Sequence, residues 1–167
     1  MILKTTILRS STRPIKYNMA IAEGRRAVAI NPNSAECHNR LGFLLRYAGE
    51  YEEALSSALK AIRLNPFAPG HYFHQLGMVY CMMERYEEAI AACKKGIRRE
   101  PNNIFAHLSL AIIYFLSGRE QDARMEAAEV LRIDPNFSLS RHSEAIVYKN
   151  QADTTRVIEA LRGAGLK

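Results

Sequence analysis

The segment from Ala35 to Asn103 contains the same pattern twice. In each copy a Leu-Gly pair is followed by Tyr-Glu-Glu-Ala and then by a closing proline, and the matching landmarks lie 35 positions apart. A repeat of this length is typical of stacked helical hairpins, in which each unit buries its apolar face against its neighbours. The sequence therefore predicts an all-α fold built from antiparallel helix pairs. Function would then depend on a surface and not on a single reactive residue.

Prolines and capping residues predict where the helices begin and end. Asn65-Pro66, Glu100-Pro101 and Asp134-Pro135 should each end a helix, because a residue before proline avoids the helical region. Ser34 is a candidate N-cap. The predicted pairs are 34–48 with 51–64, 69–83 with 86–99, and 103–117 with 120–133.

The pattern extends beyond the doubled stretch on both sides. Tyr17, Ala20, Ala27 and Pro32 have the spacing of the second helix of a unit, so the array is predicted to begin with half a unit and without its first helix. Pro14 suits the first turn of that helix. The predicted divisions are a frayed or extended N-terminus over 1–12, an array over 13–137 and C-terminal capping helices over 138–167. Within the array, the half unit covers 13–33 and the full units cover 34–68, 69–102 and 103–137.

After Pro135 the period stops. Helices are predicted at 139–148 and 154–162, with Asp153 as the N-cap of the second. Val157, Ile158 and Leu161 form an apolar stripe on this last helix that should be buried.

The landmarks of the array resemble those of the tetratricopeptide repeat family, in which Trp, Leu-Gly, Tyr, Ala and Pro stand at fixed offsets. The first unit carries them as Leu41-Gly42, Tyr51, Ala54, Ala61 and Pro66, with His38 at the Trp position. The resemblance implies a right-handed α-solenoid whose first helices line a concave groove. It also implies close helix crossings at the small residues.

Mapping the repeat onto the concave face gives the candidate peptide-groove residues. They are Asn39, Phe43, Arg46, Tyr47, His71, His74, Met78, Met82 and Ile112. Relatives that clamp a peptide's terminal carboxylate place Lys, Asn and Arg at groove positions where this chain has Phe43, His74 and Leu108, which argues against that mode. Two alternatives remain for the apolar part of the groove. It could receive a partner's amphipathic helix, or the chain's own C-terminal helices could cover it.

The net charge of +6 does not favour a nucleic-acid partner. Residues 1–33 hold six basic side chains and one acidic side chain, so the excess lies at one end of the chain and not on one face. The three cysteines are odd in number and unevenly spaced, which does not suggest a set of disulfide bonds, and no signal peptide with a sustained apolar core is visible. A reducing, cytoplasmic location is therefore expected. No stretch approaches the roughly 18 apolar residues of a membrane span.

Motifs for catalysis and metal binding are missing from the sequence. GxxxxGK[ST], GxSxG and HExxH do not occur, so neither an enzyme nor a cofactor is predicted. His71, His74 and Cys81 share a predicted helix but fall short of the four converging ligands of a zinc site, so no metal is predicted. The basic residues from Lys94 to Arg99 are interpreted as a solvated helix end.

The tail from Leu131 to Leu166 is similar to the C-terminal end of tetratricopeptide arrays in bacterial class III adenylate or guanylate cyclase proteins. The leading hypothesis is a non-enzymatic protein–protein interaction module that binds a peptide or helix in its groove. The alternative is a detached C-terminal regulatory portion of a cyclase-type signalling protein, which the missing first helix suggests. A third possibility is self-association through residues 13–30. The sequence does not identify the partner.

Overall fold

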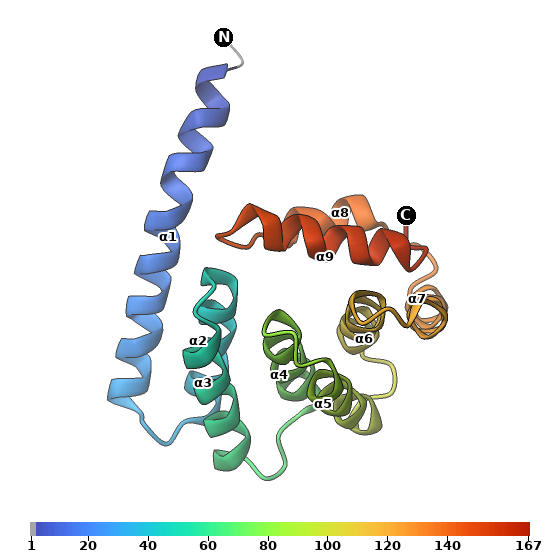
Figure 1. Cartoon of the computed structure of the whole chain (residues 1–167). Coiled ribbons are helices and arrows are strands. Elements are labelled where there is room, and N and C mark those ends of the chain that lie inside the picture. Colours follow the sequence, from blue (N-terminus) through green and yellow to red (C-terminus); the bar gives the residue numbers. More distant parts are fainter. Residues whose placement is uncertain (1–2) are drawn as a thin grey trace.

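The computed structural model describes the backbone of residues 3–167 and the side chains from Tyr17 onward (Figure 1). All regular secondary structure in the described part of the chain is helical. The helices are α1 (Leu3–Ile30), α2 (Ala35–Ala48), α3 (Tyr51–Leu64), α4 (Gly70–Met82), α5 (Tyr86–Arg99), α6 (Ile104–Leu116), α7 (Glu120–Ile133), α8 (Leu139–Ala145) and α9 (Gln151–Gly163).

Six of these helices form three hairpins, which pair α2 with α3, α4 with α5 and α6 with α7. The hairpins stack in chain order into the predicted right-handed α-solenoid, and α1 packs against α2 at one end. The close crossings fall at the small residues of the repeat. A Cβ atom on Gly42 would lie 3.2 Å from the carbonyl oxygen of Ala54, and Ala54 and Ala61 have no exposed surface.

The predicted boundaries of the three hairpins agree closely with the structure. The second helices, α3, α5 and α7, begin and end at the predicted residues. The Ser34 side chain accepts a hydrogen bond from the backbone N–H of Cys37 at 3.2 Å, which confirms it as the N-cap of α2. Asn103 caps α6 in the same way.

The N-terminal prediction was wrong in one respect. Residues 3–12 were expected to be frayed or extended, but α1 begins at Leu3 and continues through Pro14. Leu3, Lys4, Leu8, Arg9 and Arg13 favour helix on the N-terminal side of this proline, although Thr, Ser and Ile residues lie between them. Residues 1–2 lie outside the described residues.

The tail also differs from its prediction. Helix α8 ends at Ala145 and not at 148. Residues 146–148 are non-helical and lead the chain back toward α2, where the N–H of Lys149 donates to the Tyr47 carbonyl. Helix α9 begins at Gln151, and its N-cap is Asn150, whose side chain accepts from the N–H of Ala152 at 3.0 Å. Asp153 cannot cap this helix because it lies inside it.

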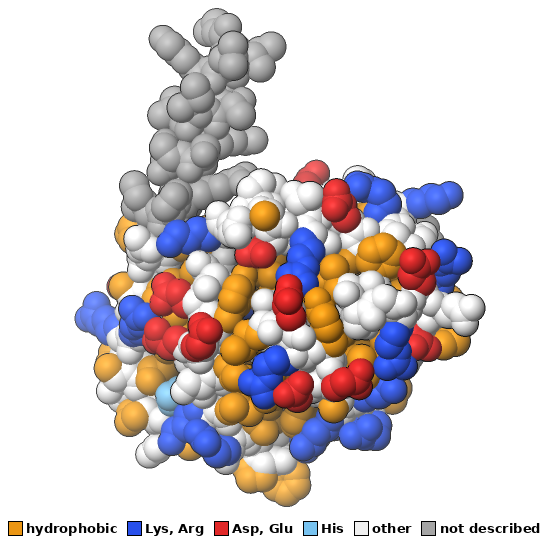
Figure 2. Space-filling model, viewed as in Figure 1, with side chains coloured by type: hydrophobic (Ala, Val, Ile, Leu, Met, Phe, Trp, Pro, Cys, Tyr) orange, Lys and Arg blue, Asp and Glu red, His pale blue; other side chains and the backbone are white. Residues whose placement is uncertain are grey.

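The largest hydrophobic core runs from α4 to α9 and joins the tail to the array. Leu110 and Ile113 of α6 pack in the same cluster as Val157 and Leu161 of α9, so the predicted burial of these two tail residues is confirmed. The outer surface is mixed in charge. Figure 2 shows Lys and Arg side chains interspersed with Asp and Glu over the face that it presents. Because α9 packs on α6, the apolar surface of the array is covered at its C-terminal end by residues of the same chain.

Candidate functional site

A cavity of about 420 Å³ lies between the first helices of the three hairpins and the tail. Helices α2, α4 and α6 contribute one wall each, and α8, α9 and the segment between them close the remaining side. Its lining residues are Phe43, Arg46, Tyr47, His71, His74, Gln75, Met78, Phe105, Leu108, Ser109, Ile112, His142, Ala145, Ile146, Tyr148 and Val157. A mostly apolar cavity of this size with a few polar groups has the properties of a ligand-binding site.

Two exposed aromatic side chains belong to this lining. Phe43 is 40% exposed and Phe105 is 55% exposed, although most of the other lining residues are buried or half-buried. The Phe105 ring lies 6.2 Å from His74 and 6.3 Å from His142, measured between ring centroids. Exposed aromatic rings beside an apolar cavity offer contact area to a partner.

Arg46 lines the cavity and is only 5% exposed. Its guanidinium carbon lies 4.3 Å from the ring centroid of Tyr47 and 5.5 Å from that of Tyr148. One terminal nitrogen, Nη1, donates a hydrogen bond to the Tyr148 hydroxyl, whereas Nε is buried without a partner. None of the ion pairs between described side chains includes Arg46. The positive charge of Arg46 is therefore stabilised by the faces of neighbouring aromatic rings and by the Tyr148 hydroxyl.

Two further buried polar atoms without a hydrogen-bond partner line the same cavity. They are Nδ1 of His74 and Oε1 of Gln75, on adjacent residues of α4. Burial lowers the pKa of His74 to about 4, and electrostatic interactions with Arg46 and His71 act in the same direction. Glu100 acts in the opposite direction, but its carboxylate already accepts from the N–H of Gly70 and the Asn103 side chain. His74 is therefore neutral at pH 7.

The lowered pKa of His74 leads to a prediction for stability against pH. The unfolded chain takes up a proton at this residue near pH 6.5, whereas the folded chain resists protonation down to about pH 4. The free energy of unfolding should fall by up to about 3 kcal/mol as pH drops from 6.5 to 4, and His74→Gln should remove that loss. Urea unfolding at several pH values measures both slopes.

His107 provides the matched control, because its pKa is shifted in the opposite direction. Its Nδ1 lies 2.7 Å from the Glu126 carboxylate, and this hydrogen bond raises the pKa of His107. The stabilisation that the charged His107 provides is fully present below pH 6.5 and is lost as pH rises through the raised pKa of His107 in the folded chain. His107→Gln should therefore leave the acid slope of the wild type in place. Equal acid slopes in wild type and His74→Gln would contradict the burial of His74.

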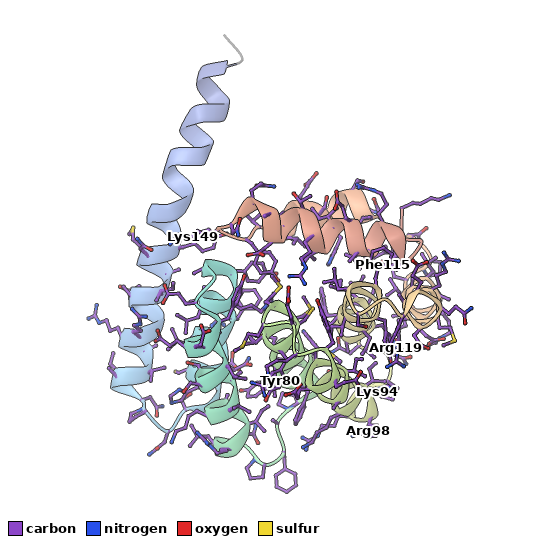
Figure 3. All side chains as sticks on the ribbon, in the orientation of Figure 1. Tyr80, Lys94, Arg98, Phe115, Arg119 and Lys149 are labelled. Carbon is purple, nitrogen blue, oxygen red and sulfur yellow. The ribbon has the colours of Figure 1, made fainter. Side chains whose placement is uncertain are left out.

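The segment between α8 and α9 crosses one end of the concave face. Tyr148 stacks on Tyr47 with ring centroids 4.6 Å apart, and the N–H of Lys149 donates to the Tyr47 carbonyl at 2.8 Å. The Tyr51 hydroxyl donates to Asp153 at 2.7 Å, which further fixes the start of α9 against the first hairpin. Figure 3 labels Lys149 at this turn, beside α1 and α2. The tail therefore completes the cavity and covers part of the groove.

The candidate groove residues divide into three groups. Seven of the nine line the cavity, namely Phe43, Arg46, Tyr47, His71, His74, Met78 and Ile112. Asn39 is buried and lines a smaller neighbouring cavity with Glu36 and Arg40. Met82 is 6% exposed and packs in the main core, so it lines neither cavity. The sequence did not identify Gln75, His142, Ile146 or Tyr148 as lining residues. The one indication that tail residues could line the cavity was the alternative in which the C-terminal helices cover the groove.

The other candidate chemistry of the sequence has structural explanations. Burial raises the pKa of the Cys81 thiol to about 12, and within the described side chains no group of three His, Cys, Asp or Glu residues could hold a metal ion. In the basic stretch of α5, Lys95 and Arg99 both lie over the Phe73 ring, and Arg99 also donates to the Pro66 carbonyl at 3.2 Å. Figure 3 labels Lys94 and Arg98 of the same helix. The contacts of Lys95 and Arg99 hold this stretch against α4 and against the loop between α3 and α4.

Sequence comparison identifies two of the units and relatives that match part of the chain. Models of the tetratricopeptide repeat match residues 35–68 and 72–103. Human protein O-mannosyl-transferase TMTC2 is 32% identical over 101 residues, which are 59% of this chain and 12% of that protein. The chain thus matches only a small part of this relative's length. Within the part of the chain that the structure describes, no helix is long and apolar enough to cross a membrane.

Comparison of structures supports the same architecture. The crystal structure of PilW, described as a widely conserved type IV pilus biogenesis factor, superposes with a TM-score of 0.69 at 20% identity and covers 95% of this chain and 71% of its own. YrrB, described as a tetratricopeptide protein with an unusual peptide-binding site, gives a TM-score of 0.58 at 21% identity, over 94% of this chain and 79% of its own. At these identities the likeness shows the fold alone.

Proposed function

Because residues 35–68 and 72–103 match models of the tetratricopeptide repeat, we propose that this chain is a non-enzymatic interaction module that binds a segment of a partner protein on its concave face. The observation that supports it most is the cavity of about 420 Å³ between α2, α4 and α6, with Phe43 and Phe105 exposed beside it. Tetratricopeptide folds are typically scaffolds for protein partners, and YrrB is described as having an unusual peptide-binding site.

The composition of the cavity indicates what kind of segment fits. Leu108, Ile112 and Val157 provide apolar surface, so an apolar side chain of the partner would gain free energy by leaving water there. The buried charge of Arg46 has no carboxylate partner among the described side chains, which favours an acidic segment over a basic one. We therefore expect a short partner segment that combines apolar and acidic residues.

Selection from a displayed peptide library against the full chain tests this function. Replacing Phe43 and Phe105 together by alanine should weaken the selected peptides at least tenfold, because both rings are exposed beside the cavity and would lose their contact area. Circular dichroism should remain that of the wild type, since neither ring is part of the buried core. Isothermal titration of the enriched peptides measures the loss.

Phe67 provides the matched control, because it is also exposed, at 88%, but lies in the loop between α3 and α4. Phe67→Ala should leave peptide affinity unchanged. A library without enriched sequences, or equal losses in the control and the double variant, would refute groove binding. Tyr47 and Met78 are unsuitable for this test, because Tyr47 stacks on Tyr148 and Met78 is 5% exposed, so truncating them would also alter the stability of the fold.

Three expectations from the sequence stay predictions. Self-association through residues 13–30 is consistent with the exposed Met19 and Ile30 of α1, at 65% and 76%, and light scattering at high concentration tests it. A cytoplasmic, reducing location is consistent with the free, fully buried Cys81 and Cys93. The relation of the tail to cyclase proteins is tested by the coding sequence upstream of Met1.

A further inference from the structure

We propose that the cavity binds the carboxylate of a Glu or Asp side chain in the partner segment, and that Arg46 provides the charge that binds it. The inference rests on the proposed function and specifies which chemical group of the partner enters the cavity. A carboxylate would accept a hydrogen bond from the Nε–H of Arg46, while Nη1 keeps its bond to the Tyr148 hydroxyl. The neighbouring apolar residue of the partner would pack against the aliphatic lining.

The first argument is the position of the unsatisfied atoms. Among the described residues, the buried side-chain atoms without a hydrogen-bond partner belong to Arg46, His74 and Gln75, and all three residues line this one cavity. Buried polar groups in folded proteins are nearly always hydrogen-bonded, so a cluster of exceptions marks a place where a ligand can supply the missing bonds. Arg46 offers a donor and Gln75 an acceptor, as a peptide segment with its own amide groups would require.

The second argument is charge. A guanidinium group stays protonated when buried, and burying it without an opposite charge is costly. The rings of Phe43, Tyr47 and Tyr148 face the Arg46 guanidinium, and none of the ion pairs between described side chains includes it. A carboxylate would convert this isolated charge into a charge-assisted hydrogen bond in a site that is largely shielded from water.

The third argument distinguishes a carboxylate from a phosphate. A phosphate group carries nearly two negative charges at pH 7 and is normally bound by several cationic or N–H donors. Arg46 is the one Lys or Arg side chain in the lining of this cavity, and burial lowers the pKa of both His74 and His142. A single negative charge is therefore the matching one.

The test uses a pair of small probes that share the same apolar body, 3-phenylpropionate with a carboxylate and 3-phenylpropionamide with a neutral amide of similar size. The Nε–H of Arg46 gives its own signal in a ¹⁵N correlation spectrum, so a titration of the full chain reports directly on the proposed contact. We expect the carboxylate to shift this signal and to bind at least tenfold more tightly than the amide. Equal binding of the two probes, or no binding of the carboxylate at tens of millimolar, would overturn the proposal.

Variants and the peptide library identify the source of the carboxylate. Peptides selected by the wild type, with blocked termini, should be enriched in Glu and Asp, and Arg46→Met should abolish that enrichment. Arg40→Met is the matched control, because Arg40 lies on the same helix with its side chain 77% exposed. Urea unfolding establishes that each variant is folded, and the probe pair tests the wild type regardless of that result.

The two proposals fail in different ways. Peptides that bind without acidic enrichment would support the interaction module and refute the carboxylate site. Binding of 3-phenylpropionate at Arg46 without any selected peptide would refute the module and leave a site for small carboxylates. Enrichment only in peptides with a free C-terminus would show a terminal carboxylate and refute the proposed side-chain ligand.

Discussion

Tyr148→Ala should lower the free energy of unfolding by about 3–5 kcal/mol. Tyr148 is 3% exposed, stacks on Tyr47 and accepts a hydrogen bond from Arg46. Truncation removes a buried aromatic ring and leaves the Arg46 guanidinium without its hydroxyl acceptor. Urea unfolding monitored by circular dichroism measures the loss.

Tyr148→Phe separates the two contributions to this effect. The variant keeps the stacked ring and removes only the hydroxyl, so its cost should be about 1–3 kcal/mol. Val147→Ala is the neighbouring control, because Val147 is only half-buried and its truncation should cost less than that of Tyr148. A Tyr148→Ala protein as stable as wild type would mean that the tail does not pack on the first hairpin in solution.

The second large effect is expected at Gly77, where α4 crosses α5. A Cβ atom placed there would overlap the Sγ atom of Cys93 and would lie 2.9 Å from the backbone carbonyl oxygen of Ala89. Gly77→Ala should therefore cost about 3 kcal/mol, even though alanine is favoured over glycine in a helix by about 1 kcal/mol. Thermal unfolding should show a lower midpoint.

Two further variants identify the cause of that loss. Cys93→Ala in the Gly77→Ala background removes the Sγ atom and should restore part of the stability. Gly42→Ala is the matched position in the first hairpin, where the nearest atom, the Ala54 carbonyl oxygen, lies at 3.2 Å. It should cost less than Gly77→Ala. Equal losses at both glycines would show that the overlap with Cys93 is not the cause.

The repeat was readable from the sequence because its information is local. The prolines that follow α3, α5 and α7 end each helix through the backbone of the preceding residue, and Ser34 begins α2 through a contact three residues away. These determinants lie within a few residues of the boundary that they set. The helix pairs could therefore be predicted without knowledge of the packing.

The tail could not be predicted in the same way. The non-helical stretch 146–148 depends on Tyr47, whose ring stacks on Tyr148 and whose carbonyl accepts from Lys149. These partners lie about one hundred residues earlier in the chain, so no local pattern encodes them. For the same reason, the helical period placed seven groove residues at the cavity but did not reveal the tail residues that complete it.

The contacts between the tail and the first hairpin have a consequence for unfolding. Units of an open solenoid contact only their neighbours, so such arrays can open from one end while the rest stays folded. Here the Tyr17 hydroxyl of α1 donates to the Val147 carbonyl, and the Tyr51 hydroxyl of α3 donates to Asp153. The C-terminal tail is therefore hydrogen-bonded directly to α1 and to the first hairpin. Opening at either end breaks contacts at the other. The chain should consequently lose its structure in one cooperative transition, and the closure of so long a loop should slow its folding.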